Sequence, residues 1–424
     1  MTGNARKGPM KRGSTLVASL VAPLVLSGCL GGSSGSSGGS DAAPCSEFDC
    51  RNMLQSLNSN VMEPAIADFE SEADKLVTEA RAYRDTLNSE AFETDAAKNA
   101  RSSAEQAWES AMLVWQEIEM MQIGPLKDNS GALRDAVYSW PATSECGLDK
   151  EIVKANEESG YDITTRTALR KGLNGIEYAL FRENLDASAG CTGDEIDTWK
   201  NDLDDQQRAE YRAEYVATAA KAVADRGAEL NQKWTGDNGF ATELTNPGSE
   251  ESRFDSAQDA VNAVSDALFY FEKQTKDIKI AEPLCGEKTN CPDSGQPDVE
   301  KVENPYSNRS KAHINQNFIA FQTLFLGNRE GEASQPGFDD FLDAINSEED
   351  GKTVSSMMET DIQQAIDDLS RVNGTLVEAL GTTSGEDSVR DVWQSAQDVT
   401  DRLKNDFLAV LGLSIPDAAA GDGD

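Results

Sequence analysis

The chain has 424 residues, and its 75 Asp and Glu outnumber its 38 Lys and Arg to give a formal net charge of −37. This excess of negative charge excludes nucleic acid and anionic lipid headgroups as electrostatic partners, because phosphates are bound by basic surfaces. The chain has a single histidine, which excludes the His-Glu-x-x-His zinc helix and any other site built on a histidine pair.

The first 28 residues read as an export signal. A basic start is followed by an apolar run over residues 15–26 that is too short to span a bilayer. The basic residues of this start are Arg6, Lys7, Lys11 and Arg12. Because the signal holds these four basic residues and no acidic ones, the chain without it carries a net charge of −41. The acidic residues are scattered, which favours a surface adapted to high salt over one that concentrates cations near a site.

The signal ends in a lipobox-like sequence, Leu26-Ser27-Gly28-Cys29, in which Cys29 would be lipidated after cleavage. The alternative is an ordinary cleaved signal with an incidental cysteine. Residues 29–45 are rich in Gly and Ser and are expected to form a flexible tether behind the anchor. We therefore predict an exported lipoprotein that is anchored to a membrane through its lipidated Cys29. Leu30 favours the outer membrane, with the protein facing the periplasm or the cell surface.

Cysteine usage agrees with export to an oxidising compartment. Six cysteines remain besides Cys29, and six cysteines allow fifteen connectivities. Proximity in the chain favours the pairs Cys45–Cys50, Cys146–Cys191 and Cys285–Cys291. A thiolate metal site is the alternative, but the chain has no Cys-x-x-Cys spacing to support it.

Apolar residues then recur at spacings of three and four, which is the pattern of amphipathic helices packed in a bundle. The stripes are clearest over residues 66–87 and 104–118, and a long helix is expected over 206–234. Residues 235–249 interrupt the pattern with three glycines and a proline, which predicts a boundary there.

Four more helical segments follow this boundary, at 254–278, 310–326, 354–380 and 388–411, and no useful stretch has the period of a β-strand. About 395 residues follow Cys29, which is long for a single core. We therefore predict an all-α protein with two helical-bundle domains. Their predicted ranges are residues 46–236 and 249–416, with an acidic tail over 417–424.

One predicted helix carries polar residues beside its apolar stripe; it reads Gly172-Leu173-Asn174-Gly175-Ile176-Glu177-Tyr178-Ala179-Leu180-Phe181. With Leu169, its leucines and isoleucine repeat at spacings of four, three and four, which is a core-facing stripe. Glu177 projects roughly 70° from the centre of this stripe, with Asn174 one turn before it. Glycine costs about 1 kcal/mol inside a helix, so Gly172 and Gly175 predict close backbone approach. The ordinary alternative for Glu177 is an edge carboxylate of a bundle.

This stretch resembles the signature of the imelysin family, which reads Gly-x-His-x-x-Glu before an apolar run. Gly172 and Glu177 match, and Asn174 stands in the place of the histidine. Further matching pieces follow the family's order: Ala107-Trp108, Trp115, Gly124-Pro125, Trp140-Pro141, residues 310–327, and the closing helix with Trp393. The resemblance covers most of the chain from Asn52 onward.

The resemblance implies an exported helical protein linked to bacterial iron uptake, with iron-uptake components as partners. The family's founding activity was reported as that of a metallopeptidase. Carried over by position, Glu177 is the first candidate for binding a metal or ligand, Asn174 the second, and Asp135 a further carboxylate. Gly172, Trp108, Trp140 and Pro141 would line this site, although such aromatic residues also form ordinary bundle cores. Oxygen ligands of this kind suit hard cations such as iron or calcium.

The asparagine weighs against catalysis, because an amide cannot act as a general base and a metallopeptidase needs a base and an activated water. We therefore predict an accessory protein of iron acquisition that binds a cation or an iron-bearing ligand near the domain junction. A residual metallopeptidase and an anchored scaffold protein remain as alternatives. The single histidine, His313, starts a predicted helix, where we expect it to cap the helix or pack at the surface.

Overall fold

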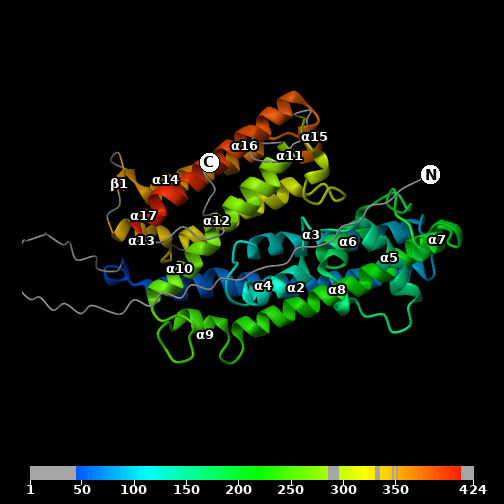
Figure 1. Cartoon of the computed structure of the whole chain (residues 1–424), viewed down its shortest axis with the longest axis horizontal. Helices are drawn as coiled ribbons and strands as arrows, with labels where there is room; N and C mark the ends of the chain where they lie inside the picture. The colour runs from blue at the N-terminus through cyan, green and yellow to red at the C-terminus, as the bar shows by residue number, and fades with distance from the viewer. Residues whose placement is uncertain (1–43, 285–295, 330–334, 346–347, 350–351, 412–424) are drawn as a thin grey trace, which may run out of the picture. The chain divides into compact units, whose positions relative to one another are not determined.

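The computed structural model describes residues 44–284, 296–329, 335–345, 348–349 and 352–411 (Figure 1). The predicted signal, the lipidation site Cys29 and the acidic tail lie outside these residues. So do Cys285 and Cys291. What the sequence indicates for these segments remains a prediction. By their contacts, the described residues belong to one compact unit.

The described residues are mainly helical, and their strands are limited to two of two residues each, so the predicted all-α class is confirmed. The helices up to residue 245 are α1 (Cys50–Ser56), α2 (Glu63–Leu87), α3 (Asp95–Ile118), α4 (Asp128–Val137), α5 (Glu145–Glu157), α6 (Gly172–Phe181), α7 (Asp194–Asn201), α8 (Asp205–Thr235) and α9 (Phe240–Thr245). Those after it are α10 (Ala257–Leu268), α11 (Glu282–Leu284), α12 (Ser310–Leu326), α13 (Phe338–Ala344), α14 (Val354–Arg371), α15 (Leu376–Leu380), α16 (Thr383–Arg402) and α17 (Leu408–Val410).

Shorter elements complete the described chain. Three π-helical segments continue neighbouring helices: η2 (Leu57–Met62), η6 (Phe271–Ala281) and η8 (Leu403–Phe407). Single 3₁₀ turns occur at η1 (Pro44–Ser46), η3 (Gly124–Leu126), η4 (Ile163–Thr165), η5 (Ala168–Arg170) and η7 (Val299–Lys301). Strands β1 (Glu348–Glu349) and β2 (Lys352–Thr353) form one small antiparallel pair.

Most predicted helices are confirmed, but three of them are divided, including 388–411, which becomes α16, η8 and α17. The segment predicted over 354–380 becomes α14 and α15, because Val372 is extended, with a ψ of 114°, and Gly374 follows with a left-handed φ of 72°. Thr375 then starts α15 in a capping box with Glu378. The segment predicted over 254–278 becomes α10 and η6. The predicted break at 235–249 contains the short helix α9.

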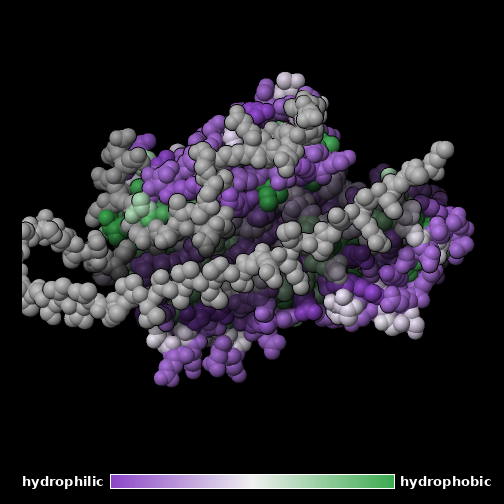
Figure 2. Space-filling model, viewed as in Figure 1, coloured by the Kyte–Doolittle hydropathy of each residue, from purple (hydrophilic) through white to green (hydrophobic). Residues whose placement is uncertain are grey.

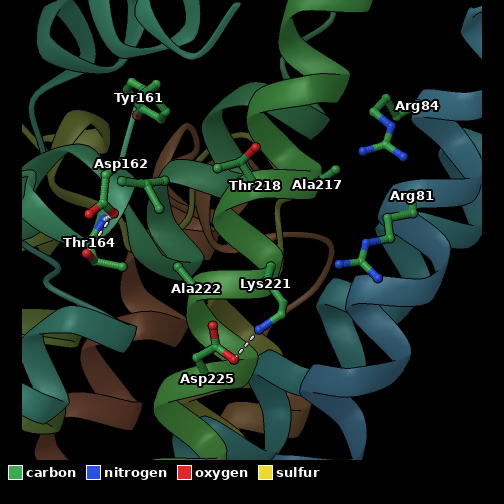
Figure 3. Close-up of a pocket in the computed structure, with 11 residues that line it drawn as sticks. Arg81, Arg84, Tyr161, Asp162, Thr164, Ala217, Thr218, Lys221, Ala222 and Asp225 are labelled. Carbon is green, nitrogen blue, oxygen red and sulfur yellow. Dashed lines mark hydrogen bonds and ion pairs between the residues drawn. The ribbon is translucent and has the colours of Figure 1, made fainter. Parts of the chain in front are cut away.

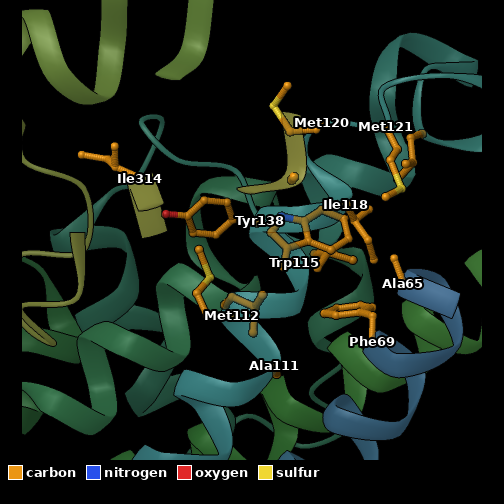
Figure 4. Close-up of a cluster of buried hydrophobic side chains, with 14 of the residues drawn as sticks. Ala65, Phe69, Ala111, Met112, Trp115, Ile118, Met120, Met121, Tyr138 and Ile314 are labelled. Carbon is orange, nitrogen blue, oxygen red and sulfur yellow. The ribbon is translucent and has the colours of Figure 1, made fainter. Parts of the chain in front are cut away.

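The helices α2, α3 and α8 lie side by side along their lengths (Figure 1). Their apolar stripes meet in a core where the Phe69 and Trp115 rings lie 5.0 Å apart. Figure 4 shows Trp115 surrounded by Phe69, Met112 and Tyr138. These side chains are at most 4% exposed. The hydroxyl of Tyr138 also takes part in a polar contact described below. Burial of each such apolar side chain stabilises the fold by about 2 kcal/mol.

After residue 254, α12, α14 and α16 pack around Phe271, Phe318 and Phe321, and all three phenylalanines are completely buried. The buried residues from both sides of the predicted boundary belong to one continuous hydrophobic cluster. The domain limits at residues 236 and 249 therefore stay a prediction. Hydrophilic side chains dominate the face shown in Figure 2. None of the helices in the described residues is long and apolar enough to cross a bilayer.

Two of the predicted disulfides are confirmed. Cys45 bonds to Cys50, and Cys146 in the first turn of α5 bonds to Cys191 before α7. The Cα atoms of each pair lie 5.4 Å apart. The second bridge closes a loop of the chain that contains α6.

Candidate functional site

The motif helix α6 is surrounded by protein. Every residue from Gly172 to Leu180 is buried. The predicted stripe was wrong at its start, because Leu169 belongs to the turn η5 and is 39% exposed. Lys171 has an extended φ of −155°, which separates that turn from α6. Glu177 also lies in the interior of the protein, at 3% exposure, so α6 has no solvent-facing side beside its apolar stripe.

Close packing explains the glycines of the motif. Gly172 has a φ of 79°, and a Cβ there would lie 2.5 Å from the carbonyl oxygen of Val137. A Cβ at Gly175 would collide with the hydroxyl of Tyr215. Both positions therefore require the absence of a side chain, as expected from their cost in a helix. This packing presses α6 against α4 and α8 and fixes the direction of the polar side chains that α6 carries.

The Glu177 carboxylate binds a loop that is far away in the sequence. It accepts hydrogen bonds from Asn304 Nδ2 at 2.9 Å, from the Ser307 amide at 2.9 Å and from the Tyr306 amide at 3.1 Å. Burial raises the pKa of Glu177 to about 7, although these three donors oppose the rise. The carboxylate thus ties α6 to the segment that leads into α12.

The other two predicted ligands have different partners. Asn174 Nδ2 donates to Thr143 Oγ1 at 2.8 Å, and its buried Oδ1 has no hydrogen-bond partner in the described structure. Asp135 has a side chain that is 42% exposed and accepts a hydrogen bond from Arg134 Nε at 2.7 Å. The contacts of Glu177, Asn174 and Asp135 do not converge on a common point. Their roles as ligands stay predictions.

The aromatic residues predicted to line the site divide into two groups. Trp108 is completely buried, and its Nε1 donates to the Leu173 carbonyl oxygen at 2.8 Å, so it buttresses the first turn of α6. Its ring packs against Phe181 at 5.0 Å. Trp140 is half-buried at the margin of the core and is joined to the exposed Pro141 by a cis peptide bond.

A second polar cluster lies inside the protein; we call Gln116, Glu119, Tyr138, Lys279, Glu303, His313 and Asn317 the Lys279 network. The ammonium of Lys279 lies 2.7 Å from Glu119 Oε2 and 3.1 Å from Glu303 Oε1. It also donates to Asn317 Oδ1 at 2.9 Å, and Tyr138 donates to Glu303 Oε1 at 2.8 Å. Because Glu303 is next to Asn304, the loop held by Glu177 also carries the central carboxylate of this network.

The network and its surroundings contain more buried carboxyl groups than buried cationic groups. Glu119, Glu177 and Glu303 are at most 5% exposed, and Lys279, which pairs with two of them, is 1% exposed. Burial raises the pKa of Glu119, and the nearby Glu303 adds to the rise while Lys279 opposes it. Burial lowers the pKa of Lys279, but its two carboxylates outweigh burial and leave the pKa raised. The ammonium of Lys279 therefore pairs with two carboxylates, Glu119 and Glu303. The third carboxylate, Glu177, binds Asn304, the residue next to Glu303.

His313 was predicted to cap α12 or to pack at the surface, and both were wrong: its ring nitrogens have no partner among the described residues, and it is 1% exposed, with Trp108 at 6.0 Å between rings. Burial, together with the cations of Lys279 and Arg309, holds its pKa well below the ordinary value, so the ring is neutral. Neither ring nitrogen has a hydrogen-bond partner among the described residues, and the same is true of Glu303 Oε2. His313 Nδ1 and Glu303 Oε2 lie 3.8 Å apart.

Sequence reasoning missed Glu119, Lys279 and Glu303. A charged residue in a helical or loop pattern normally indicates solvent exposure, and nothing local in the sequence marks these three as buried. The Asn304-Pro305 pair gave a turn signal just before α12, which could have drawn attention to this loop. In the described residues no group of three or more His, Cys, Asp or Glu side chains is arranged to hold a metal ion.

Replacing Glu177 by alanine is expected to lower the free energy of unfolding by about 3 kcal/mol, because three N–H donors lose a charged acceptor inside the protein. The control is Asn174→Ala, which removes a neutral hydrogen bond to Thr143 and should cost about 1 kcal/mol. Urea unfolding of both variants measures the difference. A loss below about 0.5 kcal/mol for Glu177→Ala would support the ordinary edge carboxylate instead.

Glu177 also makes stability depend on pH. Burial raises its pKa from the ordinary 4.5 to about 7 in the folded protein, so the folded state binds this proton more tightly. The resulting stabilisation is fully present below pH 4.5 and is lost as the pH rises through 7, a change of about 3 kcal/mol. We expect wild type to lose stability relative to Glu177→Gln between pH 5 and 8. Parallel stability curves for the two proteins would contradict the buried, shifted carboxylate.

Comparison with known proteins places these features in a family. The family model described as Imelysin matches residues 64–404. A crystal structure of a protein from Parabacteroides distasonis ATCC 8503, described as an iron-regulated protein A precursor, has 17% sequence identity and a TM-score of 0.61. That alignment covers 88% of this chain and 96% of the other chain.

A crystal structure of an imelysin-like protein from Psychrobacter arcticum 273-4 has 18% identity and a TM-score of 0.61, and covers 89% of this chain and 98% of its own. These two proteins share the fold of this chain. No curated protein sequence matches it. Because the family model spans most of the chain and includes α6 and the Lys279 network, the protein belongs to the imelysin family.

Proposed function

We propose that this protein is an exported, lipid-anchored accessory of iron acquisition that binds a cation at the Lys279 network and has no peptidase activity. Family membership supports the link to iron, as does the neighbour described as an iron-regulated protein. The observation that carries the proposal is the excess of buried carboxylates beside two unpaired ligand atoms, Glu303 Oε2 and His313 Nδ1.

Glu177 does not fit a cation in its present arrangement. Both of its oxygens accept hydrogen bonds from N–H groups, and a cation would have to displace these donors. We therefore assign Glu177 the role of holding the loop that carries Glu303. In this assignment the site still requires Glu177, but the cation binds at Glu303 and His313 instead of at Glu177.

Glu303 and His313 fit a cation better. Buried polar atoms without partners call for a bound water or ion, and these two lie 3.8 Å apart on adjoining segments. A carboxylate and a neutral imidazole together suit a divalent transition metal such as Fe²⁺ better than Ca²⁺. A divalent cation bound there would stabilise the ionised form of Glu303 and of its buried neighbour Glu119.

The peptidase alternative is disfavoured by the position of Asn174. Its amide nitrogen binds Thr143, and an amide can neither take up a proton from water nor replace the imidazole of the motif. A peptidase would also need a metal-bound water beside a free base. The Glu177 carboxylate is not free in this sense, because three donors occupy it.

Calorimetric titration of the purified protein with Fe²⁺, Fe³⁺, Zn²⁺ and Ca²⁺ tests the proposal. We expect saturation near one equivalent with Fe²⁺, loss of binding in Glu303→Gln, and unchanged binding in Asp135→Asn, which alters a half-exposed carboxylate. Peptide hydrolysis assays on the same samples should show no chelator-sensitive activity. Binding that survives Glu303→Gln and disappears in Asp135→Asn would overturn the assignment.

A further inference from the structure

A cavity of about 200 Å³ lies at the C-terminal end of α6, enclosed by α2, α3 and α8. Four basic side chains line it: Lys98, Arg101, Arg182 and Arg212. Two acidic side chains, Glu93 and Glu183, also border it, and both are exposed. A basic cavity is unexpected in a chain with a net charge of −37.

Arg212 forms the buried part of this cavity. It is 3% exposed, and its Nη1 and Nη2 donate to the carbonyl oxygens of Arg182 and Asn184 at 3.0 and 2.7 Å. Its Nε has no hydrogen-bond partner, and none of the ion pairs among the described residues involves its guanidinium. Burial lowers the pKa of Arg212 to about 10, and the cations of Arg182 and Arg101 contribute to this. The guanidinium also lies 5.7 Å from the centre of the Trp199 ring, and Tyr178 and Asp149 oppose the fall in its pKa, but no carboxylate among the described residues forms an ion pair with it.

Capping of α6 accounts for part of this arrangement. Arg101 Nε donates to the Leu180 carbonyl oxygen at 2.8 Å, which satisfies the last turn of the helix. The partial negative charge at a helix C-terminus is only about half of an elementary charge, however. Arg101 also pairs with Glu105 at 2.9 Å, and Arg182 lies 3.9 Å from Asp149. Lys98 and Arg212 are left without a carboxylate partner among the described residues.

The remaining walls suit a ligand with a carbon skeleton. Phe92, Leu180 and Leu185 supply apolar surface between the basic groups. Tyr83 also lines the cavity, and its hydroxyl makes no hydrogen bond within the described structure. A guanidinium binds a carboxylate through two parallel hydrogen bonds, and a phenol can donate a third. Charged groups flanking apolar surface favour an organic anion over an inorganic one.

We propose that this cavity binds a small organic di- or tricarboxylate between Arg182, Arg212 and Lys98. The acidic surface elsewhere does not prevent this at physiological salt, because charges beyond about 8 Å are largely screened. This site is separate from the proposed cation site, and its test needs no metal. The two proposals can therefore fail independently.

A second basic hollow on the protein provides a matched control. It lies between α2 and α8 and has Arg81, Arg84 and Lys221 on its walls (Figure 3). Arg81 is exposed and, like Lys98, has no ion pair with another described residue. Figure 3 shows Lys221 bonded to Asp225, so the charges of this hollow are partly compensated. Arg81 lies two positions from Tyr83 and therefore projects from the opposite side of α2.

The experiment is calorimetric titration of the purified, metal-free protein with citrate, succinate, inorganic phosphate and neutral succinamide at physiological salt. We expect one equivalent of citrate or succinate to bind, with phosphate weaker and succinamide silent. Lys98→Glu should weaken binding about tenfold by placing a negative charge beside the ligand. Arg81→Glu, the same change of charge in the second hollow, should leave binding unaltered. Urea unfolding of both variants checks that they fold equally well.

Three results would overturn the proposal. The first is an absence of carboxylate binding to the wild-type protein at millimolar concentrations. The second is equal weakening by Lys98→Glu and Arg81→Glu, which would reduce the effect to overall charge. The third is phosphate binding as tight as citrate binding, which would remove the role of the apolar walls.

Discussion

Replacing Lys279 by methionine is expected to lower the free energy of unfolding by about 4 kcal/mol, among the largest effects of any single substitution in this protein. The variant removes the cation that lies 2.7 Å from Glu119 and 3.1 Å from Glu303 while both carboxylates stay buried. Methionine has a similar length and preserves most of the packing, so the loss reports on charge. Urea unfolding at pH 8 measures it.

Two controls separate this effect from a general loss of lysine. Lys75→Met removes an exposed ion pair with Glu72 and should change the free energy of unfolding by less than about 0.5 kcal/mol. The defect of Lys279→Met should shrink as the pH falls from 8 to 5, because burial raises the pKa of Glu119 and its protonated form needs no cation. A defect that is constant with pH would mean that packing, and not buried charge, explains the role of Lys279.

Removing the Cys146–Cys191 bridge is also expected to cost about 4 kcal/mol, because a disulfide that spans 45 residues restricts the unfolded chain strongly. The bridge connects α5 with the segment before α7 and encloses α6 in its loop. Its loss should therefore also loosen the helix that carries Glu177. Urea unfolding of the Cys146→Ser/Cys191→Ser variant measures the effect.

The bridge between Cys45 and Cys50 is the matched control. It spans only five residues, and the same chain-entropy model predicts about 2 kcal/mol for it. Equal losses for the two double variants would contradict this account of the longer bridge. Hydrogen exchange at the α6 amides should rise in the Cys146→Ser/Cys191→Ser variant and stay unchanged in the control.

Helix boundaries were predictable where local chemistry determines them. The end of α12 was predictable because a glycine, Gly327, directly follows the last apolar residue. In the structure this glycine takes a left-handed φ of 70°. The start of α8 coincides with a capping box between Asp204 and Gln207. Both features depend on residues a few positions apart. The all-α class follows from many such local signals that agree with one another.

The candidate site was less predictable because it depends on contacts between distant segments. Glu177 and Asn304 are 127 positions apart, and Lys279 and Glu119 are 160 apart. Lys279 also belongs to the π-helical segment η6, in which an extra residue per turn shifts side chains away from the ordinary helical pattern. The family resemblance supplied Glu177 as a candidate, but its loop partner and the unpaired atoms beside His313 became visible only in three dimensions.

Anomalous diffraction from crystals soaked in Fe²⁺ under anaerobic conditions tests the central claim most directly. The proposed cation site predicts one iron peak between Glu303 Oε2 and the His313 ring, with Glu177 still bound to Asn304, Tyr306 and Ser307. A peak at Glu177 or Asp135, or no peak in crystals that remain ordered, would contradict it.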